Sequence, residues 1–281
     1  MACPLRPRPG CAYLAGSPLF IAHRGGAALA PENTMAAFRL AVDGWGVDML
    51  ETDAHLTSDG EVVLIHDWTV DRTCEGAGTI ASMTWQQVQA LDAGFHFRDL
   101  NGETSFRGRG LRVPTLDQVL EAFPDTRVNV ETKSPEVARP LLDVIQRHNA
   151  THRVLVAAEV EASRSNARGY PGPWGASTRD IARFWCASHA RMIGMLAPSF
   201  DTLQVPEFWH GLRVVTPRFV AQAHRLNIAV HIWVVNEEGD MRRLLDWGVD
   251  GIQTDRLDVL AAVLADVTGR PLRSPDAEVA S

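Results

Sequence analysis

The sequence predicts an α/β fold in which eight parallel strands, separated by helices, close into a (β/α)8 barrel. Short apolar runs of strand type alternate with segments of helical periodicity along most of the chain. The alternation continues for roughly 250 residues, the usual length of a barrel that forms one domain. We find neither a separate domain nor an internal repeat, so one barrel domain is expected over residues 18–268. An open, doubly wound sheet is the alternative arrangement for such a pattern.

The expected elements follow one another in a regular order. The strand candidates are Leu19–Ala22, Asp48–Leu56, Arg127–Thr132, Val154–Ala157, a weak candidate near Trp174–Ala176, Thr202–Val205, Ile228–Val235 and Gly248–Gln253. The helical candidates include Glu32–Asp43, Thr115–Ala122, Glu136–Gln146, Thr178–Ala190, Pro217–Leu226, Glu238–Trp247 and Leu257–Asp266. Several helices begin at a suitable capping residue or with proline in the first turn, as in Thr216-Pro217.

One segment interrupts the alternation after the second strand. Ser58-Asp59-Gly60 lies between two apolar runs and is a turn signal. We therefore expect a hairpin that returns His66 to the end of the preceding strand. Residues 92–113 are rich in glycine and arginine and are expected to form a long loop over one face of the barrel.

Composition and charge narrow the classes of function. The chain is 46% hydrophobic and 22% charged, as in ordinary globular proteins, and its net charge of -7 gives no basic footprint for nucleic acid. We find no apolar stretch of about 20 residues that could span a membrane, and no secretory signal peptide. The four cysteines are scattered without a CxxC pair, which favours unpaired thiols in a reducing cytoplasm. We expect a cytoplasmic protein with flexible termini at residues 1–17 and 269–281.

Three acidic residues are expected to meet at one end of the barrel. Glu51 and Asp53 are two residues apart in one predicted strand, and Glu131 and Lys133 are two apart at the end of another. A period of two places both members of each pair on one face, and barrel enzymes work at the carboxyl ends of their strands. Buried carboxylates repel one another unless a cation neutralises them. Three carboxylates without a thiolate suit Mg²⁺ or Ca²⁺, so we predict a metal site formed by Glu51, Asp53 and Glu131.

Two histidines are expected at the same end. His23 ends the first strand and His66 ends the hairpin. Because imidazoles titrate near neutral pH, this pair suits phosphodiester cleavage, in which one proton is removed and another is donated. Arg24 can bind phosphate oxygens bidentately, and Lys133 can place a positive charge against developing negative charge. The other eight histidines are interpreted as structural, although His55 shares a face with the acids.

Six motifs in chain order resemble one enzyme family. They are His23-Arg24-Gly25, Pro31-Glu32-Asn33-Thr34, Glu51-Thr52-Asp53, Ser58-Asp59-Gly60 with His66-Asp67, Glu131-Thr132-Lys133, and Gly248-Val249-Asp250-Gly251-Ile252-Gln253-Thr254-Asp255. Over about residues 19–265 the chain resembles the glycerophosphodiester phosphodiesterase family. The segment from Trp233 to Asn236 is similar to the family's Trp-Thr-Val-Asn, with Val234 in place of threonine. Residues 158–176 match the family poorly.

The resemblance implies a TIM barrel with a small insertion after the second strand, around residues 67–113. It implies His23 and His66 as the catalytic pair and Glu51, Asp53 and Glu131 as metal ligands. It further implies phosphate contacts from Arg24 and Lys133 and a substrate pocket lined by Trp233. The implied reaction splits glycerophosphodiesters into sn-glycerol 3-phosphate and an alcohol, with a divalent metal ion.

Three other functions compete with this interpretation. A phospholipase D of the sphingomyelinase D type is usually secreted and disulfide-bonded, which this sequence does not suggest. Lysophospholipase D activity on lysophospholipids is a second alternative, because some aromatic residues could form a lipid-facing rim; these are Phe95, Phe97, Phe106, Phe184, Trp185, Phe208 and Trp209. Ordinary packing in the core or on the barrel's exterior is the simpler role for them. A catalytically inactive phosphodiester-binding barrel is disfavoured because the histidines, acids and lysine are all present.

Overall fold

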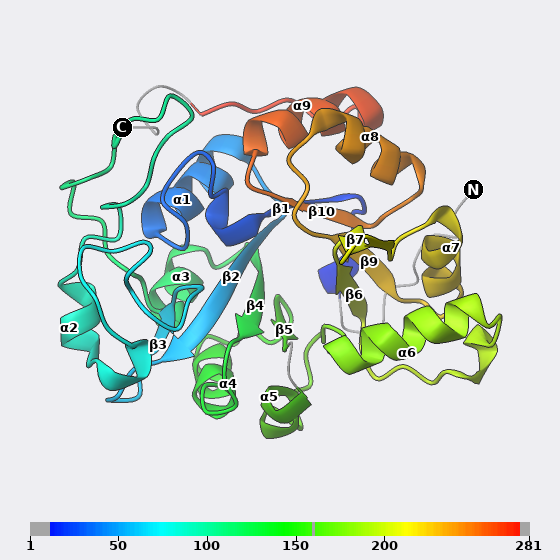
Figure 1. The fold of residues 1–281 in the computed structure, drawn as a ribbon, viewed down its shortest axis with the longest axis horizontal. Helices are drawn as coiled ribbons and strands as arrows, with labels where there is room; N and C mark the ends of the chain where they lie inside the picture. The colour runs from blue at the N-terminus through cyan, green and yellow to red at the C-terminus, as the bar shows by residue number, and fades with distance from the viewer. Residues whose placement is uncertain (1–11, 159–160, 276–281) are drawn as a thin grey trace.

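The computed structural model describes residues 12–158 and 161–275, and its centre is a curled parallel sheet (Figure 1). The strands are arranged in the spatial order β5-β4-β2-β1-β10-β9-β6. Their bounds are β1 (Leu19–Ala22), β2 (Met49–Leu56), β4 (Arg127–Thr132), β5 (Val154–Ala157), β6 (Thr202–Val205), β9 (Ala229–Ile232) and β10 (Gly251–Thr254). Single-residue bridges from Val156 to Trp174 and from Gly175 to Thr202 join the edge strands β5 and β6. The weak strand candidate near Trp174–Ala176 therefore closes the sheet, as expected for a barrel.

Helices surround the sheet (Figure 1). The α-helices are α1 (Met35–Arg39), α2 (Trp85–Gln89), α3 (Leu116–Ala122), α4 (Ala138–Arg147), α5 (Glu161–Asn166), α6 (Thr178–His189), α7 (Pro217–Arg225), α8 (Glu238–Asp246) and α9 (Leu257–Thr268). A π-helix, η3 (Leu40–Trp45), continues α1. The described residues also form the short 3-10 helices η1 (Ala12–Leu14), η2 (His23–Gly25), η4 (Ile80–Ser82) and η5 (Ile193–Met195). Within the described ranges, no helix is both long and apolar enough to cross a membrane.

Local sequence explains where the helices begin and which faces they bury. In α7 the Thr216 side chain accepts a hydrogen bond from the Phe219 backbone, and Pro217 occupies the first turn. Phe219 is fully buried and packs edge-on against Phe184 of α6, with ring centroids 4.9 Å apart. Phe184 is therefore a core residue, which excludes it from any lipid-facing rim.

The insertion after β2 forms a small subdomain on one side of the barrel. Strand β3 (Val62–Leu64) pairs antiparallel with β2, as the turn at Ser58-Asp59-Gly60 predicts. The insertion has its own apolar cluster, which consists of Val63, Ile65, Val70, Cys74, Ile80, Val88, Ala93 and Val113. Residues 92–113 contain no helix or strand, and Phe106 from this loop packs near α1. The insertion therefore has a packed core that holds His66 beside the barrel.

The described parts of both chain ends pack against the barrel. Tyr13 is buried, and its hydroxyl donates to the Met49 sulfur at 3.1 Å and to the Val128 carbonyl at 3.3 Å. Near the other end, the Arg270 guanidinium pairs with Asp48 at 2.7 Å. The outer parts of the ends that we expect to be flexible, residues 1–11 and 276–281, lie outside the described residues, as do Cys3 and Cys11.

The helix expected from Glu32 begins later, at Met35. Asn33 has a left-handed φ of 53°, and Thr34 is the N-cap residue. The Asn33 amide donates to Asp53 at 3.1 Å, and its carbonyl oxygen accepts from Thr52 at 2.7 Å. These contacts hold Asn33 in a left-handed turn against β2, so the helix begins only after this residue.

Candidate active site

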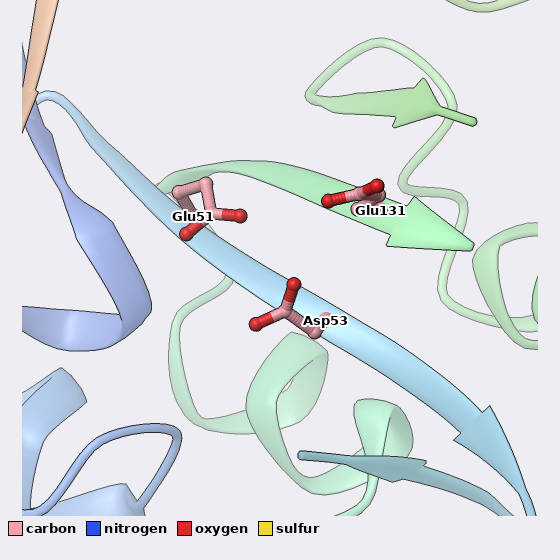
Figure 2. A group of neighbouring side chains, drawn as sticks. All are labelled: Glu51, Asp53 and Glu131. Carbon is pink, nitrogen blue, oxygen red and sulfur yellow. The ribbon is translucent and has the colours of Figure 1, made fainter. Parts of the chain in front are cut away.

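The three predicted metal ligands meet where the middle of β2 lies beside the end of β4 (Figure 2). Asp53 and Glu131 are register partners on these adjacent strands, and Glu51 lies two residues before Asp53 on the same face. One carboxylate oxygen from each residue lies within 4.8 Å of the others. Glu51 and Asp53 are buried, whereas Glu131 is partly exposed. The structure thus brings together all three acids that the sequence singled out.

These acids form a crowded negative cluster. Burial, together with the charge of Asp53, raises the pKa of Glu51 to about 7. Burial alone would also raise the pKa of Asp53, but the positive charges of Lys133 and Arg24 lower it. The Lys133 ammonium lies 2.8 Å from Asp53 and 2.9 Å from Glu131. Lys133 therefore balances part of the negative charge, and Glu51 remains the least compensated carboxylate.

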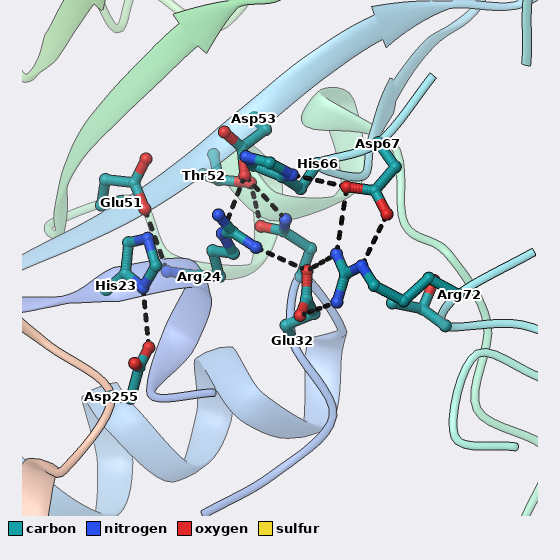
Figure 3. Close-up of polar contacts among 12 residues, drawn as sticks. His23, Arg24, Glu32, Glu51, Thr52, Asp53, His66, Asp67, Arg72 and Asp255 are labelled. Carbon is teal, nitrogen blue, oxygen red and sulfur yellow. Dashed lines mark hydrogen bonds and ion pairs between the residues drawn. The ribbon is translucent and has the colours of Figure 1, made fainter. Parts of the chain in front are cut away.

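His23 lies on one side of the acids and is held by an aspartate. Its Nδ1 is 2.7 Å from Oδ1 of Asp255, which directly follows β10 (Figure 3). The other oxygen of Asp255 accepts from the Asn236 amide at 3.0 Å. Burial lowers the pKa of His23, but the hydrogen bond to Asp255 and the charge of Glu51 outweigh it, and the pKa is raised. Because a carboxylate only accepts hydrogen bonds, Nδ1 carries the proton and Nε2 is left for proton transfer.

His66 lies on the other side of the acids and has the same kind of partner. Its Nδ1 is 2.6 Å from Oδ1 of Asp67. Burial would raise the pKa of Asp67, but hydrogen bonds from Arg72 and His66 lower it to about 2. The His66 carbonyl accepts from Nε2 of His55 at 3.1 Å. His55, which we interpreted as structural, therefore holds the His66 backbone, and burial lowers the pKa of His55.

A tight turn after β1 places Arg24 between the histidines. Arg24 has a left-handed φ of 50°, and its backbone N–H donates to Glu51 at 3.0 Å. Its guanidinium lies 3.0 Å from Glu32 and 3.5 Å from Asp53. A Cβ atom on Gly25 would lie 2.8 Å from that of Ala37, so only glycine fits there. Gly25 therefore allows the tight turn, and the contacts with the acids orient the Arg24 side chain.

Trp233 follows β9 at the same end of the barrel. Its backbone N–H donates to the carbonyl of Val205, the last residue of β6, at 3.2 Å. Its side chain is 41% exposed. This position is compatible with the predicted pocket lining, which stays a prediction.

Comparisons with known proteins agree with this geometry. A sequence model described as the glycerophosphoryl diester phosphodiesterase family matches residues 23–170 and 176–259. The chain belongs to this family. A glycerophosphodiester phosphodiesterase of Caldanaerobacter subterraneus is 34% identical over 261 residues, covering 86% of this chain and 96% of the relative. A probable glycerophosphodiester phosphodiesterase 2 of Mycobacterium tuberculosis is 33% identical over 256 residues, covering 89% and 91%.

The fold agrees as well. The crystal structure of a glycerophosphoryl diester phosphodiesterase domain from Mycobacterium tuberculosis superposes with a TM-score of 0.77 at 24% identity, covering 89% of this chain and all of that one. The barrel with a small antiparallel insertion is thus the fold of this family. As a member, the chain is a phosphodiesterase, a hydrolase of phosphodiester bonds. Membership in the family excludes the alternative of an unrelated open sheet.

The sequence did not identify every residue that shapes the site of this phosphodiesterase. Asp255 and Asp67 each orient a histidine, and Arg72 and Glu32 join the two sides of the site through ion pairs. Asp67 adjoins His66 and Asp255 directly follows a strand at the active face, so both had a readable signal. Arg72 is surrounded by turn sequence, and no local pattern distinguishes it from a surface arginine.

The chemistry of the donor set fits a divalent cation. Hard carboxylate oxygens are the ligands that Mg²⁺ and Ca²⁺ prefer, and three of them converge here. Burial and the charge of Asp53 raise the pKa of Glu51, so a bound cation would favour its ionised form. A cation bound by Glu51, Asp53 and Glu131 would stabilise the ionised form of all three.

Proposed function

We propose that the chain hydrolyses glycerophosphodiesters to sn-glycerol 3-phosphate and an alcohol, with Mg²⁺ or Ca²⁺ bound by Glu51, Asp53 and Glu131. The observation that carries the proposal is that two histidines, each held by an aspartate, lie beside the three-carboxylate cluster. Figure 3 shows both histidines with Glu51 and Asp53 of that cluster. A binding module would not need two such imidazoles beside a metal site, so the arrangement supports catalysis.

His23 and His66 are the proposed acid and base. Asp255 and Asp67 each fix the proton on Nδ1, so each Nε2 can accept a proton from the nucleophile or, once protonated, donate one to the leaving oxygen. At the start of a turnover, one imidazole must therefore be neutral, to act as the base, and the other protonated, to act as the acid. The charge of Glu51 stabilises the protonated form of His23.

Arg24 and Lys133 are the proposed phosphate ligands. Both cations already lie beside Asp53, so an incoming phosphodiester would meet two positive side chains at the acid cluster. When bound, a divalent cation would add Lewis-acid polarisation of a phosphoryl oxygen. Partly buried positive groups that are fixed before the substrate arrives can stabilise developing charge without reorganisation.

The nucleophile is either water or the glycerol 2-hydroxyl of the substrate. Attack by the hydroxyl would give a cyclic phosphate that is then hydrolysed, with the advantage of an intramolecular reaction. ³¹P NMR during turnover separates the two routes, since a cyclic phosphate has its own resonance.

The direct test is release of glycerol 3-phosphate from glycerophosphocholine with added Mg²⁺ or Ca²⁺, followed by chelator. We expect metal-dependent release that the chelator abolishes and that added metal restores. Release that continues unchanged in excess chelator would contradict the metal site. No release with either metal would contradict the substrate.

A second candidate is lysophospholipase D activity, and exposed apolar side chains favour it. The hairpin formed by β7 (Phe208–Trp209) and β8 (Leu212–Arg213) follows β6 at the active end of the barrel. Phe208, Trp209 and Leu212 are exposed there, and so is Trp233 after β9. An acyl chain could pack on these residues. Trp209→Ser should lower turnover of lysophosphatidylcholine but not of glycerophosphocholine; equal effects would argue against this substrate.

A cytoplasmic location stays a prediction.

A further inference from the structure

We infer that Arg72 is a positioning residue that fixes His66 against the barrel, so that the insertion and the β1 turn act as one active site. The inference rests on the proposed function. Arg72 lies in the turn segment between β3 and η4, outside the six sequence motifs. It touches neither the acid cluster nor a reacting group, and it acts through two carboxylates.

Arg72 makes two ion pairs with opposite sides of the site (Figure 3). Its Nε and Nη2 donate to Asp67 at 2.5 and 3.3 Å. Its Nη1 and Nη2 donate to Glu32 at 2.7 and 2.8 Å. Glu32 lies 40 residues earlier in the chain, on the loop that leads into α1. One planar guanidinium thus binds both carboxylates bidentately, which only arginine can do.

Each carboxylate also contacts a proposed functional residue. Asp67 accepts from His66, and Glu32 accepts from Arg24 at 3.0 Å. The continuous path therefore runs from His66 through Asp67, Arg72 and Glu32 to Arg24. The alternation of two carboxylates with two guanidiniums leaves this part of the network without net charge.

The position of His66 explains why it needs such support. It follows β3, a strand of three residues, and 34% of its side chain is exposed. His55 holds the backbone carbonyl of His66, whereas Asp67 holds the ring. Because Asp67 is itself 30% exposed, its own orientation depends on what binds it. Arg72 supplies that contact and ties it to the barrel through Glu32.

If Arg72 only stabilised the fold, its removal would lower the melting temperature. The Arg72 side chain is 48% exposed, and exposed ion pairs contribute little to stability. Its loss should therefore leave the fold intact and disturb only the orientation of the His66 ring. A suitable control is Arg242, which is 41% exposed and likewise bridges two carboxylates, Glu238 and Asp266, on the outer helices α8 and α9.

The kinetic test compares Arg72→Ala, Arg72→Lys and Arg242→Ala on glycerophosphocholine. We expect Arg72→Ala to lower kcat about tenfold, with KM, metal affinity and melting temperature nearly unchanged. Arg72→Lys should recover only part of the loss, and Arg242→Ala should match the wild type. In the Asp67→Asn background, Arg72→Ala should add no further loss. A rise in KM with unchanged kcat, or additive losses in the double variant, would overturn the inference.

A second readout does not depend on turnover. The Nδ1 proton of His66 should give a protected imidazole NMR signal, assigned by its absence in His66→Gln. We expect Arg72→Ala to abolish this signal by faster solvent exchange and Arg242→Ala to retain it. Retention of the signal in Arg72→Ala would overturn the inference even if the wild type hydrolysed no glycerophosphodiester.

Discussion

The two histidine–aspartate pairs of this phosphodiesterase are alike in geometry but differ in setting. His23 is 13% exposed and its aspartate is held by the amide of Asn236, whose oxygen also accepts from the Asp255 backbone at 2.9 Å. His66 is 34% exposed and its aspartate is held by the ion pair with Arg72. The first pair belongs to the barrel and depends on buried hydrogen bonds. The second belongs to the insertion and depends on partly exposed charges.

The difference shows how an insertion can complete a barrel active site. A barrel strand end fixes a side chain through its neighbours in the sheet, as β1 and β10 do for His23 and Asp255. A short hairpin cannot do this alone, so ion pairs across the mouth replace the sheet contacts. Because exposed ion pairs are screened by salt, the His66 side of the site should be the more salt-sensitive.

Removal of either active-site imidazole should have the largest effect on turnover. His23→Ala and His66→Ala should each lower kcat by roughly 10²-fold or more, the usual contribution of a general acid or base. Steady-state kinetics on glycerophosphocholine measure this, with His152→Ala as control because His152 is exposed and bonds only to a loop carbonyl. Near-normal turnover in either active-site variant would remove that histidine from the mechanism.

Replacement of each aspartate should distinguish the buried His23 pair from the more exposed His66 pair. Asp255→Asn should lower kcat by roughly 30-fold and Asp67→Asn by about tenfold, because burial makes the charge of Asp255 more effective at its histidine. The loss in Asp67→Asn should also shrink as salt rises, since salt already weakens the wild-type contact. Equal losses at all salt concentrations would show that the two pairs are equivalent.

The acids between the histidines allow a test of metal binding. With its pKa raised to about 7, Glu51 should release roughly half a proton when metal binds at pH 7. Calorimetric titration with Mg²⁺ or Ca²⁺ in two buffers of different ionisation enthalpy measures this release. Glu51→Gln should bind metal more weakly and release fewer protons. Unchanged affinity and proton release in Glu51→Gln would exclude Glu51 as a ligand.

The smallest expected effect concerns stability and pH in the metal-free protein. The folded-state pKa of His23 is raised above 6.5, so protonation of His23 favours the folded state. This stabilisation is fully present below about pH 6.5 and is lost as pH rises through the folded-state pKa. The melting-temperature difference between wild type and Asp255→Asn, on the order of 2 °C, should therefore shrink with rising pH. In the His23→Gln background the difference should not depend on pH.

Periodicity predicted the parts of the molecule that depend on local sequence. Seven of the eight expected strands, the β2–β3 hairpin and the convergence of Glu51, Asp53 and Glu131 follow from apolar runs, a turn signal and the period of two. The eighth candidate, near Trp174–Ala176, forms only single-residue bridges. The short helices α2 and α5 and the β7–β8 hairpin were not predicted, because elements of two to six residues carry too little pattern.

The two long-range contacts of the histidine network could not be predicted from spacing. His23 and Asp255 are 232 residues apart, and Arg72 and Glu32 are 40 apart, so each contact exists only after the barrel and its insertion have assembled. The late start of α1 has a similar cause, because Asn33 is committed to Asp53 and Thr52. Long-range polar contacts of this kind leave no periodic trace in a sequence.

The central claim, that His23 and His66 act on opposite oxygens of one phosphodiester, is tested most directly with two leaving groups. Glycerophosphocholine needs a protonated leaving oxygen, whereas glycerol p-nitrophenyl phosphate releases a stable anion without an acid. We predict that one of His23→Ala and His66→Ala regains most of its activity on the nitrophenyl ester while the other stays impaired. The regained variant identifies the general acid. Equal impairment of both variants on both substrates would contradict the division of roles.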